Sequence, residues 1–193
     1  MPSQPTLILA STSPRRREIL AALDLEFMVN GVEIDERRLD SETAEDMVLR
    51  LASVKVAAVP VVHSDRVIGA DTAVVLGNTI LGKPLNRDEA VAMLLSLSGR
   101  RHRVLTGVAL RGPDGVQTVL SETDVYFRAI SQDEAHAYWQ SGEPRDKAGA
   151  YGIQGLGGVF VERLDGSYSG VVGLPVFETV QLLQNAGIDV LVK

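Results

Sequence analysis

An acidic side chain interrupts an apolar stretch in the first half of the chain. Asp71 stands within Ile68–Leu76, which reads IGADTAVVL and otherwise looks like a buried strand. A carboxylate in such a place costs free energy unless it is ion-paired, hydrogen-bonded or bound to a cation. The position is therefore a candidate for a functional site; the alternative is a structural aspartate that accepts hydrogen bonds from a neighbouring loop. In a regular strand the next residue, Thr72, points to the opposite face.

A second chemical feature lies near the N-terminus, where Leu7–Arg17 reads LILASTSPRRR. Its apolar start suits a short buried strand. Ser13 suits the N-cap of a helix, and Pro14 suits the first helical position. Free backbone N–H groups, the positive end of the helix dipole and guanidinium donors would together favour a phosphate. A capped surface helix with solvated arginines is the alternative.

Two lysines occupy positions from which they could meet an anion. Lys83 lies between Gly82 and Pro84, which restrict the backbone, and its ammonium suits a phosphate oxygen. Lysines in turns are usually solvated, so this signal is weak by itself. Lys55 lies near the apolar stripe of an expected helix, where it either snorkels to solvent or reaches into a cleft.

An acidic loop follows the first expected helix. Glu33, Asp35 and Glu36 occur within GVEIDERRLD, and together with Asp71 they offer the oxygen ligands that a hard cation such as Mg²⁺ takes. A solvated surface loop is the alternative interpretation.

A glycine-rich stretch, Asp146–Gly155, reads DKAGAYGIQG. Glycines among small side chains allow the backbone to approach a ligand closely. Tyr151 supplies an aromatic ring, and Gln154 supplies an amide that both donates and accepts, which suits the edge of a nucleobase. A flexible loop is the competing interpretation.

Periodicity and turn residues indicate the elements that would hold these side chains. Apolar spacing and caps predict helices over residues 14–23, 43–59, 86–98, 131–142 and 175–185. Apolar runs predict strands over residues 7–10, 26–29, 67–76, 79–81, 104–110, 116–127, 159–163 and 168–172. Turn signals at Gly77-Asn78, Gly112–Gly115 and Asp165-Gly166 indicate hairpins. Hairpins mixed with crossover helices favour an α/β fold with a mixed sheet.

Composition limits the classes of partner. The chain has 193 residues, 45% of them hydrophobic, which suffices for a sizeable core in one domain or two small lobes. A net charge of −6 disfavours a long nucleic-acid partner but leaves room for a nucleotide at a local cluster of arginines. No apolar run has the length of a membrane span, so we expect no membrane partner.

The absence of cysteine excludes disulfides, thiolate metal sites and a cysteine nucleophile, and it is compatible with the cytoplasm. The three histidines, His63, His102 and His136, lack metal-ligand spacing, so we expect ordinary surface or packing residues.

Several of these segments, taken in order, carry a resemblance to a known family. The segments are LASTSPRR, GVEIDE, RLASVKVA, IGADTAVVLGNTILGKP, LSGRRHRVLTGVAL, DKAGAYGIQGLGG and GSYSGVVGLP. Together they resemble the Maf family of nucleoside triphosphate pyrophosphatases, from about Leu7 to Leu183. The resemblance implies one Maf-like domain over residues 1–193. It also implies a fold like that of the inosine triphosphate pyrophosphatases, with an elongated mixed sheet, flanking helices and two lobes around a central cleft.

The resemblance also implies roles for individual residues. By position, Asp71 matches the catalytic aspartate of the family, and Glu33 matches its acidic partner, which with Asp71 would hold Mg²⁺ or Mn²⁺. Because the acidic loop reads GVEIDE, Glu36 is an alternative to Glu33, and Asp71 is either a general base or a metal ligand. Positions associated with substrate choice are Arg15, Thr72 and Gln154. The polar and basic positions of the cleft are Ser11, Ser13, Arg16, Lys55 and Lys83.

The implied reaction is hydrolysis of a nucleoside triphosphate to the monophosphate and pyrophosphate. The forms GADT and AGAYGIQG resemble the subgroup that acts on dTTP and UTP, and the family-level purpose is removal of modified nucleotides from the pool. Two alternatives stay open: a 7-methyl-GTP pyrophosphatase, and a nucleotide-binding regulator of cell division. The resemblance further suggests a homodimer and a cytoplasmic location.

Overall fold

The computed structural model describes residues 6–61 and 65–191, so His63 lies outside the described part of the chain. Its α-helices are α1 (Pro14–Ala21), α2 (Ala44–Ala58), α3 (Arg87–Leu97), α4 (Gln132–Gln140), α5 (Tyr168–Val172) and α6 (Val176–Asn185). Three short 3₁₀ helices are η1 (Glu143–Asp146), η2 (Ala148–Ala150) and η3 (Leu156–Phe160). Within the described residues, no helix combines the length and the apolar character needed to cross a bilayer.

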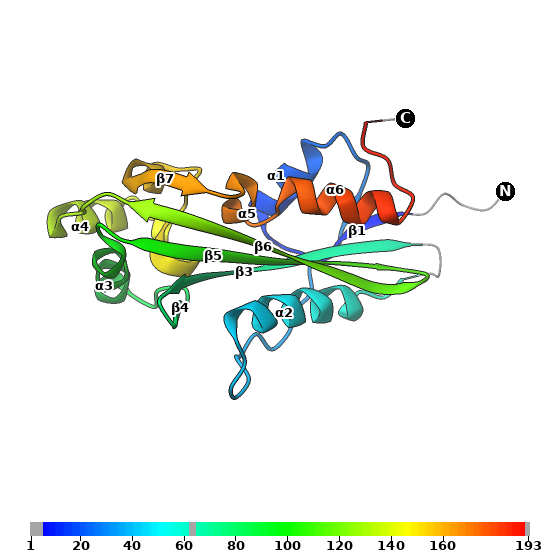
Figure 1. Cartoon of the computed structure of the whole chain (residues 1–193), viewed down its shortest axis with the longest axis horizontal. Coiled ribbons are helices and arrows are strands. Elements are labelled where there is room, and N and C mark those ends of the chain that lie inside the picture. Colours follow the sequence, from blue (N-terminus) through cyan, green and yellow to red (C-terminus); the bar gives the residue numbers. More distant parts are fainter. Residues whose placement is uncertain (1–5, 62–64, 192–193) are drawn as a thin grey trace. The chain divides into compact units, whose positions relative to one another are not determined.

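The strands form one mixed sheet of seven strands in the order β2-β1-β3-β5-β6-β7, with β4 paired to β3 (Figure 1). They are β1 (Leu7–Leu9), β2 (Met28–Val29), β3 (Arg66–Leu76), β4 (Thr79–Leu81), β5 (Arg101–Gly112), β6 (Gly115–Phe127) and β7 (Val161–Asp165). β1 pairs in parallel with β2 and β3, whereas β4 and β7 pair antiparallel with their neighbours. The expected mixed α/β sheet with flanking helices is therefore confirmed, and the central cleft stays a prediction.

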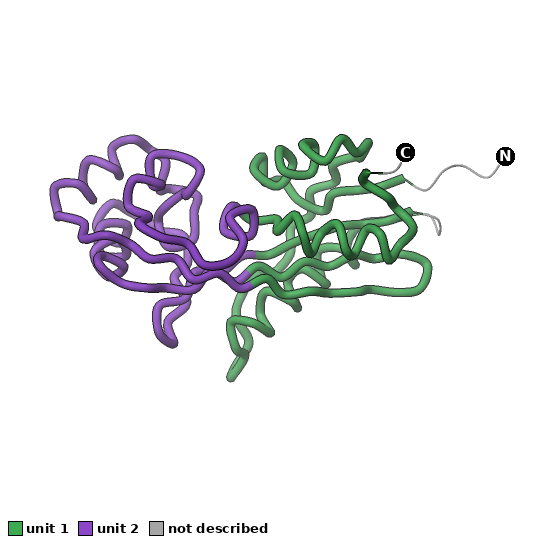
Figure 2. Tube along the Cα trace, turned by 45° about the horizontal axis from the view of Figure 1, so that its top comes forward, with its two compact units in different colours: residues 1–71, 106–121, 173–193 green, residues 72–105, 122–172 purple. Residues whose placement is uncertain are grey.

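The chain divides into two compact units (Figure 2). Unit 1 contains residues 1–71, 106–121 and 173–193, and unit 2 contains residues 72–105 and 122–172. The strands β3, β5 and β6 each contribute residues to both units. The assignment of residues 1–193 to one domain stays a prediction.

In unit 1, alternation along the strands sends side chains to two separate cores. Ile68 and Ala70 of β3 join the core covered by α1 and α6, whereas Val67 joins the core covered by α2 (Figure 1). Because side chains alternate along a strand, Asp71 has the same parity as Val67 and belongs to the α2 face. Thr72 has the opposite parity, and the direction of its side chain stays a prediction.

Two glycines allow α2 to lie close to the sheet. A Cβ on Gly107 of β5 would stand 2.5 Å from the carbonyl oxygen of Val48, and one on Gly69 of β3 would stand 2.9 Å from a methyl carbon of Val56. The first contact is with helix backbone, so a side chain at Gly107 would displace the helix rather than a flexible group. The position of α2, and of the side chains that it carries, depends on this close approach.

Unit 2 has its own core around α3, α4 and a cluster of aromatic rings. His102 is 1% exposed, lies edge-on to Phe127 at 4.8 Å between ring centroids, and shares a hydrogen bond of 2.9 Å with the hydroxyl of Tyr151. Of the two roles expected for His102, a surface or a packing residue, the structure shows the packing one. Burial lowers the pKa of His102 to about 4.

Most expected elements are confirmed, including the helix caps at Asn86 and Ser131. The hairpin expected at Asp165-Gly166 is wrong, because the segment after Gly166 forms α5 rather than a strand. Ser167 explains the difference: its hydroxyl accepts from the amide of Gly170, and its own amide donates to the hydroxyl of Thr123. A side chain that caps the first turn of a helix competes with the strand conformation.

Replacing Gly107 by alanine should destabilise the protein by about 2 kcal/mol, because the new methyl group overlaps the backbone of α2. Urea unfolding followed by circular dichroism measures the loss. Gly82→Ala is the control, since a Cβ there meets nothing within 4 Å. Equal stability of the two variants would show that α2 does not depend on the glycine.

His102 should make stability fall as the solution is acidified. The unfolded histidine binds a proton near pH 6.5, whereas the folded one does so only near pH 4. The stabilising contribution is therefore complete above pH 6.5 and is lost as the pH falls from there towards 4. Between pH 7.5 and 5, wild type should lose about 2 kcal/mol more than His102→Gln in urea unfolding. Parallel losses in the two proteins would contradict this assignment.

Candidate functional site

A buried lysine joins two carboxylates in unit 1. The ammonium of Lys55 on α2 donates to Asp71 Oδ1 of β3 at 2.6 Å and lies 2.7 Å from Glu36 Oε1. Lys55 is 7% exposed and Asp71 is 9% exposed. The lysine therefore reaches inward rather than snorkelling, and the isolated carboxylate of the apolar strand has its ion-pair partner.

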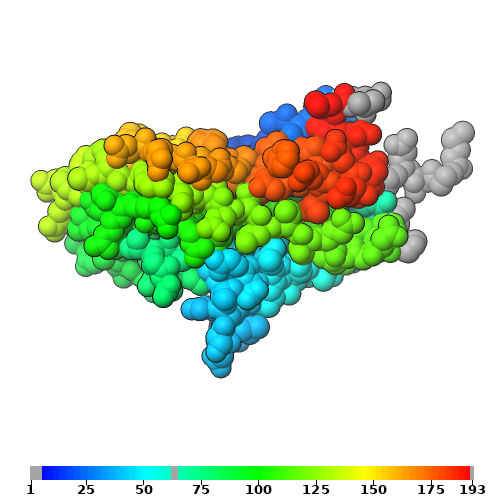
Figure 3. All heavy atoms as spheres, viewed as in Figure 1, coloured from blue at the N-terminus to red at the C-terminus, as the bar shows by residue number. Residues whose placement is uncertain are grey.

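The acidic loop is held against α2 by a second ion pair that the sequence did not single out. The guanidinium of Arg50 binds the Glu42 carboxylate through two bonds of 2.5 and 2.9 Å and also donates to the carbonyl of Arg37. Arg50 lowers the pKa of Glu42 to about 2. In Figure 3 the segment that leads into α2 projects at the bottom of the view, coloured light blue. No periodic signal marks Arg50 for this role.

Both acidic alternatives are exposed, and of the two it is Glu36 that makes the ion pair with Lys55. The loop has neither helical nor strand periodicity, so the sequence alone could not rank them. The structure thus places Glu36, rather than Glu33, next to the lysine that binds Asp71.

Arg16 adds positive charge to the same group. Its Nε donates to the carbonyl of Gly173 at 2.8 Å, which orients the guanidinium. Burial lowers the pKa of Arg16, while the negative charges of Asp71 and Glu36 act in the opposite direction. Arg16 therefore interacts electrostatically with both carboxylates.

The start of α1 has the local structure that the sequence predicts. Ser13 is the N-cap, and its hydroxyl accepts from the amide of Arg16 at 3.4 Å. Ser11 is buried, and its hydroxyl accepts from the amide of Ser13 at 3.1 Å. Arg15 is half-buried in the first turn. These hydroxyls and guanidinium groups therefore gather at the N-terminal end of one helix.

The remaining candidates belong to unit 2. Thr72 is half-buried and follows Asp71 on β3, whereas Lys83 and Gln154 are exposed. The amide of Gly149 donates to the carbonyl of Gly82 at 3.0 Å, which ties the turn that carries Lys83 to the glycine-rich stretch. The sequence-predicted residues are therefore divided between unit 1 and unit 2.

The carboxylates of Asp71 and Glu36 in unit 1 are of the type that binds a divalent cation. Mg²⁺ is usually held by one or two carboxylates, with water and substrate phosphates completing its coordination. Asp71 and Glu36 meet this requirement. The ammonium of Lys55 contacts both carboxylates, so the two are close enough together to share one cation. Among the described residues no group of three or more potential ligands forms a closed metal cage. The chemistry thus fits a cation that is shared with a substrate.

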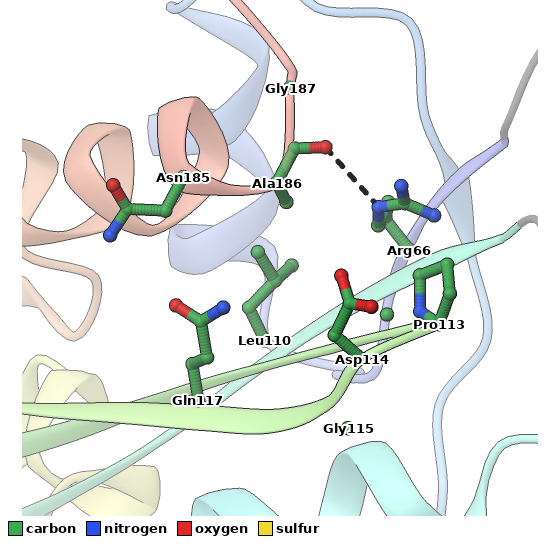
Figure 4. Close-up of a pocket in the computed structure, with 10 residues that line it drawn as sticks. Arg66, Leu110, Pro113, Asp114, Gly115, Gln117, Asn185, Ala186 and Gly187 are labelled. Carbon is green, nitrogen blue, oxygen red and sulfur yellow. Dashed lines mark hydrogen bonds between the residues drawn. The ribbon is translucent and has the colours of Figure 1, made fainter.

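A separate pocket of about 170 Å³ lies in unit 1 beside the turn between β5 and β6 (Figure 4). Arg66 lines it and donates to the carbonyl of Ala186 at 3.4 Å. None of the candidate site residues predicted from the sequence lines this pocket, and we assign it no role.

Comparison with known proteins gives consistent results. The family model of Maf-like proteins matches residues 6–186. A dTTP/UTP pyrophosphatase of Hahella chejuensis is 52% identical over 193 residues, covering 98% of this chain and 96% of the relative. A dTTP/UTP pyrophosphatase of Methylobacillus flagellatus is 50% identical over 188 residues, covering 95% and 94%. Among solved structures, the Ham1 protein of Staphylococcus aureus matches with a TM-score of 0.45 and 16% identity, over 66% of this chain and 72% of that one.

Replacing Lys55 by methionine should destabilise the protein by about 3 kcal/mol, because it leaves the buried carboxylate of Asp71 without its nearest cation. The double variant Lys55→Met/Asp71→Asn removes the stranded charge as well and should recover part of the loss. Urea unfolding at pH 7.5 compares the two. If the single variant is as stable as the double one, the Lys55–Asp71 pair does not compensate a buried charge.

Proposed function

The chain belongs to the Maf family, and on that premise we propose that it hydrolyses nucleoside triphosphates, with dTTP and UTP preferred, to the monophosphate and pyrophosphate. The observation that carries the proposal is the group of Lys55, Asp71, Glu36 and Arg16 in unit 1. It combines two carboxylates with positive charges, as phosphoryl transfer requires. Relatives named for this activity match nearly the whole chain.

The reaction breaks the bridging bond between the α- and β-phosphorus atoms. The oxygen of water attacks the α-phosphorus, the electron pair of the bridging bond leaves with pyrophosphate, and the water gives up a proton. Arg16 and Lys55 offset the charge that develops on the departing oxygens, and the N-terminal end of α1 adds its dipole. Asp71 accepts the proton of the water as a general base, or it serves as a metal ligand.

Asp71 and Glu36 would hold the Mg²⁺ or Mn²⁺ that the resemblance implies. When bound, such an ion neutralises phosphate charge and makes a bound water more acidic. Lys55 keeps both carboxylates close together, and Arg50 fixes the loop that supplies one of them.

We assign substrate choice to Arg15, Thr72 and Gln154, and contacts with the triphosphate to Ser11, Ser13 and Lys83, as the resemblance implies. We expect the activity in the cytoplasm, where the nucleoside triphosphate pool lies, and removal of modified nucleotides is the purpose that the family suggests. A homodimer is likewise expected, and light scattering of the purified protein measures it.

Release of pyrophosphate from dTTP, UTP, CTP, ATP and 7-methyl-GTP, with and without Mg²⁺ or Mn²⁺, tests the proposed function. We expect turnover of dTTP and UTP to exceed that of the others. A preference for 7-methyl-GTP would instead identify the chain as a 7-methyl-GTP pyrophosphatase. Tight nucleotide binding without release of pyrophosphate from any of them would favour the regulator.

Asp71→Asn should lower kcat for dTTP by about 10²- to 10⁴-fold, because the amide neither accepts a proton nor binds a cation as a carboxylate does. Nucleotide binding measured by calorimetry should change little. Partial recovery of turnover at high Mg²⁺ would indicate that Asp71 is a metal ligand. No recovery would indicate that it is the general base. Asp88→Asn is the matched control, since that side chain is 81% exposed in a surface ion pair. Wild-type turnover in Asp71→Asn would remove the residue from the mechanism.

Glu36→Gln should raise the Mg²⁺ concentration for half-maximal activity by about tenfold, because one of the two carboxylates near Lys55 loses its charge. For Glu33→Gln, in the same loop, this Mg²⁺ concentration should stay within about twofold of wild type, since Glu36 and not Glu33 holds the position next to Lys55. Metal titrations at fixed dTTP measure both. A larger effect in Glu33→Gln would support the assignment carried over from the family.

A further inference from the structure

A single carboxylate accepts hydrogen bonds from the backbone of the glycine-rich region of unit 2. Glu143, at the start of η1, accepts from the amide of Leu156 at 2.8 Å and from the amide of Gly157 at 3.0 Å. Its Oε1 also accepts from the hydroxyl of Tyr138 at 2.7 Å. Three hydrogen bonds thus end on one side chain, two of them from amides that follow it by 13 and 14 residues.

Tyr138 extends this network to a second point of the stretch. Its hydroxyl donates to Glu143 and accepts from the amide of Gly152 at 3.1 Å. The ring of Tyr138 is buried and lies edge-on to Phe160 at 5.2 Å between centroids. The phenol therefore gives the carboxylate a rigid connection to the other end of the segment.

The glycines of the segment leave room for this network. A Cβ on Gly155 would stand 2.3 Å from Glu143 Oε2, and one on Gly157 would stand 2.5 Å from the hydroxyl of Tyr138. Both distances are far below ordinary contact, so side chains at these positions would expel the carboxylate or the phenol. The spacing of glycines, expected to admit a ligand, admits a side chain of the protein itself.

The carboxylate is held in its charged form. Burial acts to raise the pKa of Glu143, but hydrogen bonds from Tyr138, Gly157 and Leu156 outweigh it and keep the pKa below its ordinary value. Lys147 binds the main-chain carbonyl of Glu143 and the carboxylate of Asp146, and its charge acts in the same direction. An ionised acceptor binds backbone amides more strongly than a neutral one.

We infer that Glu143 is a positioning residue that fixes residues 152–157 and thereby the direction of the Gln154 amide, which sets the choice of nucleobase. Gln154 lies between the amide of Gly152, held through Tyr138, and that of Leu156, held directly. Its own side chain is exposed. With both flanks held, the backbone at Gln154 has little freedom, and an amide must be well oriented to distinguish the edges of bases. This inference rests on the proposed function.

Steady-state kinetics of the full chain test it. The variants are Glu143→Gln, whose amide has one accepting oxygen instead of two, and Tyr138→Phe, which keeps the ring but loses the hydroxyl. The ratio of kcat/KM for UTP to that for ATP should fall about tenfold in Glu143→Gln and several-fold in Tyr138→Phe, as expected for one lost or misdirected hydrogen bond. The change should lie in KM for UTP. Inhibition by inorganic tripolyphosphate, which has no base, should stay within about twofold of wild type.

Two controls separate positioning from a general loss of structure. Glu134→Gln removes a carboxylate of the same unit that caps α4 and pairs with Arg128; it should lower stability without changing the UTP/ATP ratio. Adding Glu143→Gln to Gln154→Ala should lower the ratio no further than Gln154→Ala alone, because the first change acts through the second residue. Thermal unfolding of each variant reports its stability.

Each result decides the inference. A lowered ratio in Glu143→Gln or Tyr138→Phe, with unchanged inhibition by tripolyphosphate and an unchanged ratio in Glu134→Gln, supports it. If Glu143→Gln does not fold, Tyr138→Phe decides alone. An active wild type with an unchanged ratio in the variants overturns this inference and leaves the proposed function intact. A wild type that releases no pyrophosphate from any triphosphate overturns both.

Discussion

The ion pair between Lys55 and Asp71 is the interaction on which the rest of the site depends. Both groups are buried, so each would cost several kcal/mol of desolvation without the other. The pair can form only if α2 lies close to β3, and the glycines that face α2 allow that approach. A constraint on backbone packing thus becomes a constraint on which charged groups meet.

A pair of this kind is an uncertain source of stability, since apolar residues of similar volume often serve a fold as well. Its presence inside an otherwise apolar sheet is better explained by chemistry than by folding. Glu36 supports this view, because it approaches the same ammonium from an exposed loop and brings a second carboxylate to the edge of the buried pair.

Much of this arrangement was predictable from the sequence. Asp71 was recognisable because a carboxylate is conspicuous in an apolar strand, and the caps at Asn86 and Ser131 were recognisable because local hydrogen bonds determine them. Lys55 was ambiguous, since helical spacing shows where a side chain starts but not which partner it meets. Glu33 and Glu36 could not be ranked, because a tertiary contact fixes their loop. The turn residues Asp165-Gly166 predicted a hairpin, which was wrong. The cap formed by Ser167 starts α5 instead, and that cap was not recognised from the sequence.

The ammonium between the two carboxylates has a consequence for folding. It serves as an internal counterion that offsets one of the two negative charges when the chain folds and reduces the repulsion between the carboxylates. Folding therefore needs no ion from solution, unlike that of small domains whose ligands repel one another until metal arrives. A chelator should accordingly leave the native state folded.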